Sequence, residues 1–196
     1  MGRIGVLALQ GDFREHAQVL RRLGAETVEV RLPDHVKGID GLVIPGGEST
    51  TIGLLLDRYA LRQPIVEMAS RGMPIWGTCA GMIMLSRDAG DTRVCPLGLM
   101  DIHVVRNAFG RQVDSFEADL SVPILGERAF RAVFIRAPIA DGVGPGVEVL
   151  ARMPDGRIAA ARQGRLLATA FHPELTNDPR FHRLFISMCE DTDHPW

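Results

Sequence analysis

Over the first 85 residues or so, short apolar runs alternate with segments of helical character, and this alternation limits the possible folds more than any other feature. The apolar runs are Ile4 to Leu9, Thr27 to Arg31, Leu42 to Ile44 and Pro74 to Trp76. Segments with helical character, 12–24, 52–59, 64–71 and 82–85, separate or follow them. Strands that alternate with helices predict a mostly parallel sheet covered by helices on both faces.

Beyond about residue 100 the pattern changes to β-type runs separated by Gly, Pro and Asp. These runs are Ile102 to Val105, Ala129 to Ile135, Val147 to Leu150, Ile158 to Ala161 and Leu166 to Phe171. We expect them to add mixed or antiparallel strands to the same sheet. A last helix is expected after Asp178 as N-cap, with Pro179 at its first position. The sequence therefore predicts one α/β domain over residues 1–190 and a frayed tail at residues 191–196.

Composition argues against several classes of protein. Hydrophobic residues make up 46% of the 196 residues and charged residues 23%, as in globular enzymes. The net charge is −2 and the basic residues are scattered, so we expect no nucleic-acid partner. No run of about 18 apolar residues occurs, so we expect neither a membrane span nor secretion. Three cysteines far apart, with no C-x-x-C pair, indicate a reducing, cytoplasmic setting.

The segment Gly77-Thr78-Cys79-Ala80-Gly81 is a G-x-C-x-G motif between an expected strand and an expected helix. This form is typical of a nucleophile elbow, with sulfur in place of oxygen. Both glycines are needed because the turn strains the central residue and flanking side chains would collide with neighbouring elements. Cys79 would project from a strand end, where the next helix N-terminus favours its thiolate form. A buried cysteine in a glycine-rich turn is the alternative.

The segment His172-Pro173-Glu174 supplies what a cysteine nucleophile needs. His172 can accept the thiol proton, and Glu174 can orient the imidazole and stabilise its charge. Residues two apart on an extended segment share a face, and Pro173 restricts His172 to extended geometry. Alone, the tripeptide fits a structural histidine equally well. Together with Cys79 it predicts a Cys-His-Glu catalytic triad.

A third motif, Pro45 to Thr51, directly follows the strand expected at Leu42 to Ile44 and contains two glycines. We expect the amide of Gly47, together with that of Ala80, to form an oxyanion hole for a tetrahedral intermediate. A phosphate-binding turn is the alternative, and it is weaker because the chain has neither a Walker lysine nor a G-x-G-x-x-G motif. A capped helix start, with Ser49 or Thr50 as the N-cap, is the purely structural interpretation of this motif and is compatible with either function.

Taken together, these motifs and their order resemble the triad-type (class I) glutamine amidotransferases, and within them the glutaminase subunits of pyridoxal 5′-phosphate synthase. The resemblance spans about residues 4 to 185, and its most specific run is Arg106 to Phe116. Other matching segments are Leu9 to Gly11, Arg14 to His16, Pro45 to Thr51, Gly77 to Gly81, Phe134 to Pro138 and Phe171 to Leu175. The resemblance implies a flavodoxin-like, three-layer α/β fold. No motif in the chain supplies a cofactor site of its own, so we expect no cofactor.

The resemblance also implies the reaction and its partner. L-Glutamine would be hydrolysed to L-glutamate and ammonia through a γ-glutamyl thioester on Cys79. The ammonia would pass to a synthase subunit that makes pyridoxal 5′-phosphate, the active form of vitamin B6. A glutaminase that serves another synthase, and a catalytically silent regulatory subunit, are the alternatives.

By the same resemblance, several residues acquire roles around the substrate. The glutamine pocket would be lined by Gly47, Glu48, Ser49, Arg106, Ile135 and Arg136. Gln10 and Gly11 would shape or switch the oxyanion hole when the partner docks. An ordinary salt bridge is the alternative for Arg106, and a simple turn is the alternative for Gly11.

Other reactive residues have no catalytic role in this interpretation. Histidines other than His172 lack metal-ligand spacing, so we expect no metal site. His16 is a candidate for contact with the partner, and Cys95 and Cys189 are interpreted as packing residues. A solvated face is expected for Asp114, Glu117 and Asp119.

Overall fold

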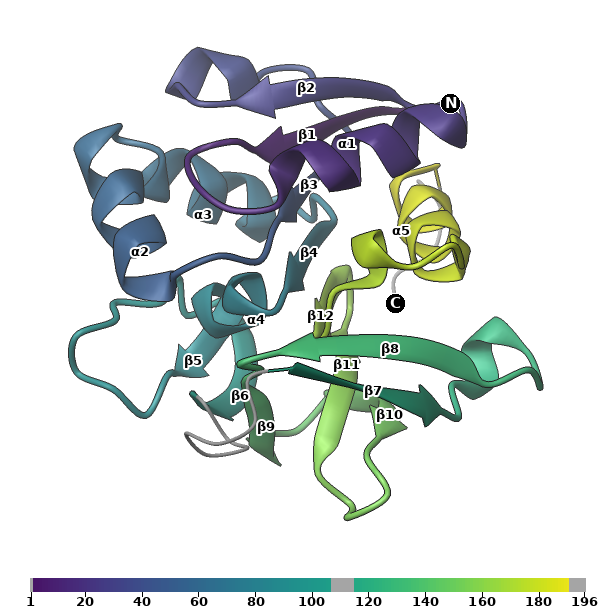
Figure 1. Ribbon diagram of the computed structural model, residues 1–196. Helices are drawn as coiled ribbons and strands as arrows, with labels where there is room; N and C mark the ends of the chain where they lie inside the picture. Colours follow the sequence, from purple (N-terminus) through teal and green to yellow (C-terminus); the bar gives the residue numbers. More distant parts are fainter. Residues whose placement is uncertain (1, 107–114, 191–196) are drawn as a thin grey trace.

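The computed structural model describes residues 2–106 and 115–190, which form a central sheet with helices packed against it (Figure 1). The strands of the main sheet are β1 (Arg3–Leu7), β2 (Glu26–Val30), β3 (Gly41–Ile44), β4 (Ile75–Thr78), β5 (Ser86–Asp88), β6 (Met100–Val105), β9 (Ile139–Val143), β10 (Glu148–Arg152), β11 (Ile158–Gln163) and β12 (Leu166–Thr169). Their order is β2-β1-β3-β4-β12-β11-β9-β6-β5, with β10 paired to β11.

Helices cover both faces of the sheet. They are α1 (Phe13–Arg22), α2 (Ser49–Arg58), α3 (Arg62–Ser70), α4 (Ala80–Leu85) and α5 (Arg180–Glu190), with short 3₁₀ turns η1 (Pro33–Val36), η2 (Pro123–Leu125) and η3 (Pro173–Leu175). Trp76 of β4 contacts rings of α1 and α5, whereas a Cβ placed on its neighbour Gly77 would overlap Gly81 of α4. Successive strand residues point to opposite faces, so α1 and α5 cover one face and α4, packed against α2, covers the other.

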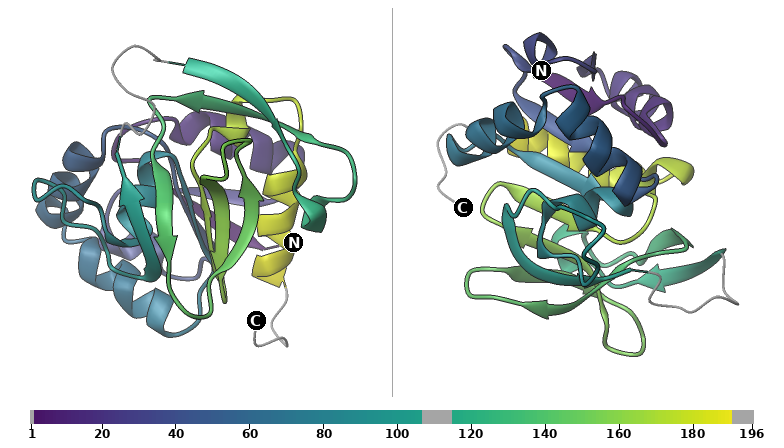
Figure 2. Two further views of the ribbon diagram at one scale, coloured as in Figure 1. Left: turned by 90° about the horizontal axis from the view of Figure 1, so that it is seen from below. Right: turned by 90° about the vertical axis from the view of Figure 1, so that its left-hand side faces the viewer.

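The sheet has a parallel half and an antiparallel half. Strands β2, β1, β3, β4 and β12 are all parallel, and β3 and β4 are buried along their whole length. Complete burial is expected where helices cover both faces of a parallel sheet. Beyond β12, strands β11, β9 and β6 pair antiparallel, and Figure 2 shows β9, β11 and β10 side by side. The predicted change from parallel to mixed pairing is confirmed.

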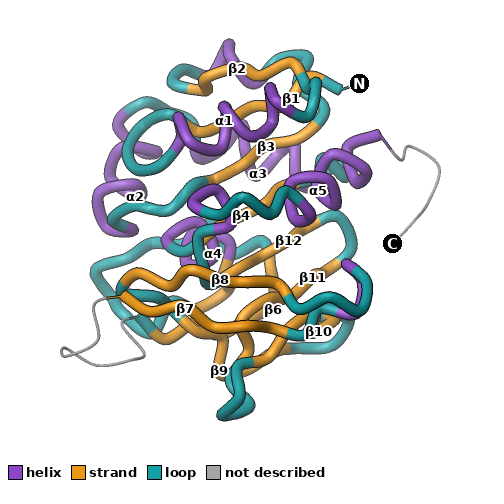
Figure 3. The backbone as a smooth tube through the Cα atoms, turned by 45° about the vertical axis from the view of Figure 1, so that its right-hand side comes forward, coloured by secondary structure: helices purple, strands orange, loops and turns teal. Residues whose placement is uncertain are grey.

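A separate two-stranded ribbon consists of β7 (Ser115–Leu120) and β8 (Phe130–Ile135), which run antiparallel (Figure 3). Phe130 and Phe134 are fully buried and contact the ring of Phe171, the residue before the predicted histidine base. In addition, the backbone N–H of His172 donates to the carbonyl of Val133 at 2.8 Å. The ribbon therefore anchors the segment that carries His172.

Three strands were not expected from the sequence: β5, β7 and β9. In β7, Glu117 and Asp119 face solvent as expected, and both pair with Arg131. The alternate residues Phe116, Ala118 and Leu120 are partly or fully buried, so the segment is a strand with one solvated face. Strands β5 and β9 depend on pairing with β6, a contact that local sequence does not encode.

Some predictions concern residues that the structure does not describe. Asp114 and most of the run from Arg106 to Phe116 lie among residues 107–114, and the expected frayed tail is residues 191–196. The single-domain boundary at residue 190 stays a prediction. Among the helices of residues 2–106 and 115–190, none combines the length and apolar character that a membrane crossing requires.

Replacement of Gly77 by alanine is expected to destabilise the protein. The added Cβ would overlap backbone atoms of Gly81, so β4 and α4 would have to separate, at a cost of about 1–3 kcal/mol. Thermal unfolding should show a lower melting temperature. Gly142→Ala is the matched control, because the nearest atom to its new Cβ would be 3.8 Å away on His103. Equal melting temperatures for Gly77→Ala and the unmodified protein would contradict this account.

Candidate active site

Four neighbouring strand ends supply the candidate site. Strands β1, β3, β4 and β12 are parallel and adjacent, so their carboxyl ends lie at one edge of the sheet, where open α/β sheets bind ligands. The segments that follow them carry Gln10, Gly47, Cys79 and His172 in turn. All four residues line one pocket of about 380 Å³, a volume suited to a small molecule.

The pocket brings together most of the site residues that the sequence predicted. Those lining it are Gln10, Gly47, Glu48, Ser49, Cys79, Ala80, Arg106, Ile135, Arg136 and His172. Of the remaining predicted residues, Glu174 lies behind His172 and Gly11 lies beneath the loop after β3. The lining also includes Asp12, Ile83 and Pro138, which the sequence analysis did not single out.

Cys79 has the strained backbone expected of a nucleophile elbow. Its φ is 48° and its ψ is −108°, a left-handed conformation that is uncommon for residues other than glycine. A Cβ at Gly77 would overlap Gly81, and a Cβ at Gly81 would overlap the backbone of Ile44. These contacts explain why glycine occupies both positions. The Cys79 amide is held by the carbonyl of Thr169 at 2.8 Å, and its Sγ lies 3.8 Å from the carbonyl of Ile135.

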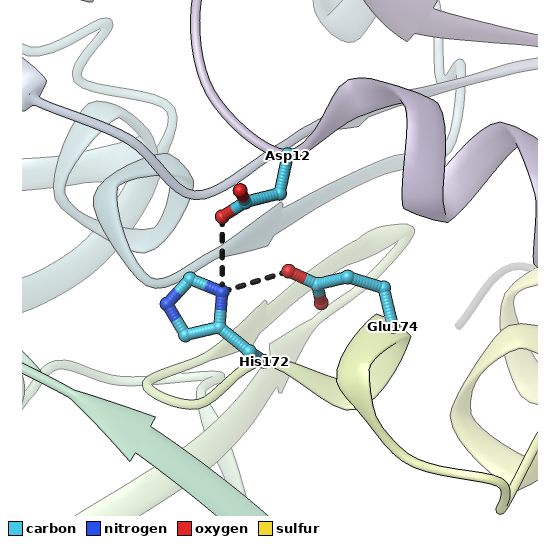
Figure 4. Close-up of side chains that lie close together, drawn as sticks. All are labelled: Asp12, His172 and Glu174. Carbon is cyan, nitrogen blue, oxygen red and sulfur yellow. Dashed lines mark hydrogen bonds and ion pairs between the residues drawn. The ribbon is translucent and has the colours of Figure 1, made fainter. Parts of the chain in front are cut away.

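His172 is held between two carboxylates, as Figure 4 shows. Its Nδ1 lies 2.7 Å from Oε1 of Glu174 and 3.4 Å from Oδ2 of Asp12. A carboxylate can only accept, so we assign a proton to Nδ1, which leaves Nε2 to face Cys79. Burial opposes a charge on His172, but hydrogen bonds with Asp12, Cys79 and Glu174 outweigh it and raise the pKa of His172 to about 12.

Glu174 is ionised although its side chain is fully buried. Burial alone would raise its pKa, but electrostatic contacts with His16 and His172 hold the pKa of Glu174 well below its usual value. The pair therefore consists of an imidazolium and a carboxylate in a region of low dielectric, where their attraction is strong. Such a pair can keep the imidazole ring in one orientation.

Asp12, His172 and Glu174 also have the spacing of metal ligands, with one ligand atom of each within 4.8 Å of the others. We interpret the group as a charged histidine with two counter-charges. A metal ion on Nδ1 would have to displace the proton that both carboxylates stabilise. The absence of a metal site stays a prediction.

The loop after β1 supports the loop expected to form the oxyanion hole. Oε1 of Gln10 accepts a hydrogen bond from the amide of Glu48 at 2.7 Å, and a Cβ at Gly47 would overlap the Gln10 amide group. Gly11 has φ of 91° and lies directly against the carbonyl of Gly46. Gly11 therefore does more than make a simple turn. Ala80 begins α4, where helix N–H groups lack intrahelical partners.

Glu48, and not Ser49 or Thr50, is the N-cap of α2, so that expectation was wrong. Its carboxylate accepts hydrogen bonds from the amides of Thr50 at 3.1 Å and Thr51 at 2.7 Å. The glutamate side chain is long enough to fold back over the first turn, which places Ser49 inside the helix. The Ser49 hydroxyl is buried, lines the pocket and has no hydrogen-bond partner among the described residues.

Two ion pairs hold the Arg106 side chain at the pocket. It contacts Oε1 of Glu48 at 3.1 Å and Oδ2 of Asp91 at 2.7 Å. The salt bridge that the sequence left as an alternative is therefore present, and the same residue also lines the pocket. No local sequence signal pointed to Asp91. Asp12 could have been found, because it follows Gln10 and Gly11 at a strand end.

Two further expectations need correction. His16 is fully buried beneath the site and so cannot face a partner, because its position in α1 points it toward Trp76 of the core. Cys95 is exposed and is not a packing residue, whereas Cys189 is buried as expected. Burial raises the pKa of the Cys189 thiol to about 12, which keeps it unreactive.

The charge on Glu48 is expected to stabilise the protein only above moderately acidic pH. Burial favours its neutral form, but hydrogen bonds from Thr51 and Thr50 lower the pKa of Glu48 to about 2. Since this value lies below the unfolded-state value of about 4.3, the stabilisation is present at neutral pH and is lost as pH falls from about 5 toward 2. Glu48→Gln should therefore reduce the free energy of unfolding at neutral pH by up to about 1 kcal/mol.

Chemical denaturation across this pH range provides the measurement. The difference between Glu48→Gln and the unmodified protein should shrink as the pH falls. Glu67→Gln is the control, because Glu67 is an exposed helical glutamate whose carboxylate contacts Gln63 on the same helix. A Glu48→Gln deficit that stays constant with pH would show that the charge is not the stabilising feature.

Comparison with known proteins places the chain in a family. Its sequence matches the SNO glutamine amidotransferase family over residues 6–191. It is 62% identical over 188 residues to the pyridoxal 5′-phosphate synthase subunit PdxT of Herpetosiphon aurantiacus, covering 94% of this chain and 99% of that protein. The protein of the same name from Pelotomaculum thermopropionicum is 60% identical over 187 residues, which are 95% of each chain.

Solved structures agree with this placement. A crystal structure described as a glutamine amidotransferase superposes with a TM-score of 0.90 at 49% identity, covering 95% of this chain and 98% of that one. The structure of PurLQS from Thermotoga maritima shares the fold, with a TM-score of 0.68 at 20% identity, and the match covers 95% of this chain and 99% of that one. The predicted flavodoxin-like α/β fold is confirmed, and the chain belongs to the SNO glutamine amidotransferase family.

Proposed function

We propose that this chain hydrolyses L-glutamine to L-glutamate and ammonia with Cys79 as nucleophile, His172 as base and Glu174 as the partner of His172. One observation carries the proposal. A cysteine in a strained elbow and a histidine whose Nδ1 lies 2.7 Å from the Glu174 carboxylate line the same small pocket. Membership of a glutamine amidotransferase family supplies the substrate.

In the proposed reaction, the Cys79 thiolate attacks the side-chain carboxamide carbon of glutamine. Backbone N–H groups of Gly47 and Ala80 stabilise the resulting oxyanion. His172 donates its Nε2 proton to the leaving nitrogen, so that ammonia departs and a γ-glutamyl thioester remains. A water molecule, deprotonated by His172, then attacks the thioester, which releases glutamate and restores the Cys79 thiolate beside a protonated His172.

The pocket walls suit the two ends of the amino acid. Glu48 stays ionised and can attract the α-ammonium group of glutamine, while Arg106 and the free Ser49 hydroxyl can donate to its α-carboxylate. Ile135 and Arg136 close the opposite wall in this proposal. A positive φ of 42° at Arg136 turns the chain sharply there.

We extend the proposal to the partner on the strength of the relatives' names. Proteins 62% and 60% identical over nearly the whole chain are called subunits of pyridoxal 5′-phosphate synthase. The ammonia would then be used by the synthase subunit of that enzyme, in the cytoplasm. The Gln10 support of the Gly47 loop gives the partner a means of changing the oxyanion hole, because a shift of the β1 loop would release the Glu48 amide.

Glutamate release from L-glutamine tests the proposal. Activity should appear or rise with the synthase subunit of pyridoxal 5′-phosphate synthase and should disappear in Cys79→Ala. Cys95→Ser is the control, because Cys95 is an exposed cysteine that does not line the pocket. Activity that survives Cys79→Ala would refute the triad, and a complex without any glutaminase activity would favour the silent regulatory subunit.

Asp12→Asn is expected to move the basic limb of the pH profile of kcat/KM to lower pH. Asp12 is one of the contacts that raise the pKa of His172, so neutralising it must lower that pKa, and the imidazolium is lost earlier as pH rises. The Asp12 side chain makes no capping hydrogen bond to α1, so the helix start should be unaffected. Asp34→Asn, which removes a remote exposed carboxylate, is the control. An unchanged basic limb would contradict the role of Asp12.

A further inference from the structure

Behind Glu174, on the side away from the pocket, lies a group of buried polar side chains that the proposed reaction does not use. His16 of α1, His182 of α5 and Thr78 of β4 are all fully buried. Nε2 of His16 lies 3.1 Å from Oε2 of Glu174 and 3.1 Å from the hydroxyl of Thr78. Nδ1 of His16 lies 3.0 Å from Nε2 of His182. The group thus links α5 to the triad carboxylate through α1.

We propose that His16 is a positioning residue that holds the Glu174 carboxylate toward His172, and that His182 in turn holds the tautomer of His16. The inference rests on the proposed triad. Oε1 of Glu174 is occupied by His172, so a rotation of the carboxylate would break that contact. His16 approaches the other oxygen, Oε2, and thereby opposes such a rotation.

The proton positions along this group can be assigned from its chemistry. The carboxylate can only accept, so Nε2 of His16 carries a proton directed toward Oε2 and the Thr78 hydroxyl. Oε2 has no hydrogen bond of regular geometry among the described residues, so at 3.1 Å the Nε2–H group of His16 stabilises the carboxylate charge mainly through its bond dipole. Nδ1 of a neutral His16 is then an acceptor, and His182 Nε2–H donates to it.

The surroundings of His182, at the end of the group away from Glu174, agree with this assignment. Burial holds the pKa of His182 well below its usual value, with His16 and Arg22 acting in the same direction and Glu174 opposing them. His182 is therefore neutral, and with its proton on Nε2 its Nδ1 is a bare lone pair. That Nδ1 is buried without a partner among the described residues, which costs less for a lone pair than for an N–H.

Packing keeps both rings in place. The ring centroids of His16 and His182 lie 5.5 and 4.9 Å from that of Trp76, both edge to face. Two histidines that served only to fill the core would need no carboxylate contact, and apolar side chains would fill the same volume at a lower desolvation cost. The titratable groups around Glu174 are then His172, with Asp12 next to it, on one side and the neutral His16 and His182 on the other.

Two substitutions at His16 separate positioning from packing. His16→Gln keeps an amide nitrogen near the position of Nε2, whereas His16→Leu keeps bulk but removes the donor. In the complex with the synthase subunit, His16→Leu should lower kcat on the order of 10- to 100-fold with little change in KM, and His16→Gln should recover most of it. Without the His16 proton, Glu174 binds a proton more readily, so the acid limb of kcat/KM should move to higher pH in His16→Leu.

Leu20→Ala is the control for lost packing, because Leu20 is a fully buried residue of the same helix outside the site. It should destabilise the protein without moving the acid limb. A His16→Leu variant with an unshifted acid limb, or a His16→Gln variant no more active than His16→Leu, would overturn the inference. His182→Leu should show the same shift in a weaker form.

A second readout keeps this inference distinct from the proposed function. The rate of Cys79 alkylation by iodoacetamide, measured against pH in a Cys95→Ser background, reports the thiolate–imidazolium pair without any turnover. His16→Leu should shift this profile and His16→Gln should restore it, whether or not glutamine is hydrolysed. Loss of glutamine hydrolysis with an intact alkylation shift would refute the proposed function alone, and an alkylation profile that His16→Leu leaves unchanged would refute the positioning role.

Discussion

The close approach of α4 to strands β3 and β4 is the constraint on which the site depends. Gly77 and Gly81 bring the backbone of the helix into direct contact with the strands, and no other residue fits at either position without displacing main-chain atoms. Because the two elements are so close, the residue between them must take up a left-handed conformation. The strain at Cys79 is therefore a consequence of packing, and the surrounding buried strands support it.

The charges of the site follow from the same burial. Glu174 can remain ionised in a fully enclosed position only because His172 and His16 approach its two oxygens. His172 can remain charged because Glu174 and Asp12 share its Nδ1. Each ionised group would be costly alone, and breaking such a set by removing one member leaves an uncompensated charge. The arrangement joins α1, η3 and the loop after β1 into one unit behind the nucleophile.

Sequence reasoning located the site because parallel strand ends coincide. Cys79, His172 and the loop from Pro45 each directly follow an apolar run, and in a parallel sheet these positions converge at one edge. It did less well where side chains from distant segments meet. His16 was expected at the surface and lies in the core, and the role of Asp91 as a partner of Arg106 had no local signal. Glu48 replaced Ser49 or Thr50 as the N-cap because its longer side chain reaches back over the first turn.

The sequence by itself determined the elements of the parallel half, the need for glycine around Cys79 and the position of Cys79, His172 and the loop from Pro45 at strand ends, because apolar periodicity and turn chemistry act over only a few residues. The other predicted pocket residues came from the resemblance to a family. Only the tertiary structure decided the antiparallel additions β5, β7 and β9, the second carboxylate at His172 and the buried histidines behind Glu174. These features depend on contacts between segments far apart in the chain. His16 and Glu174, for example, are separated by most of the sequence, and only the packing of α1 against η3 brings them together.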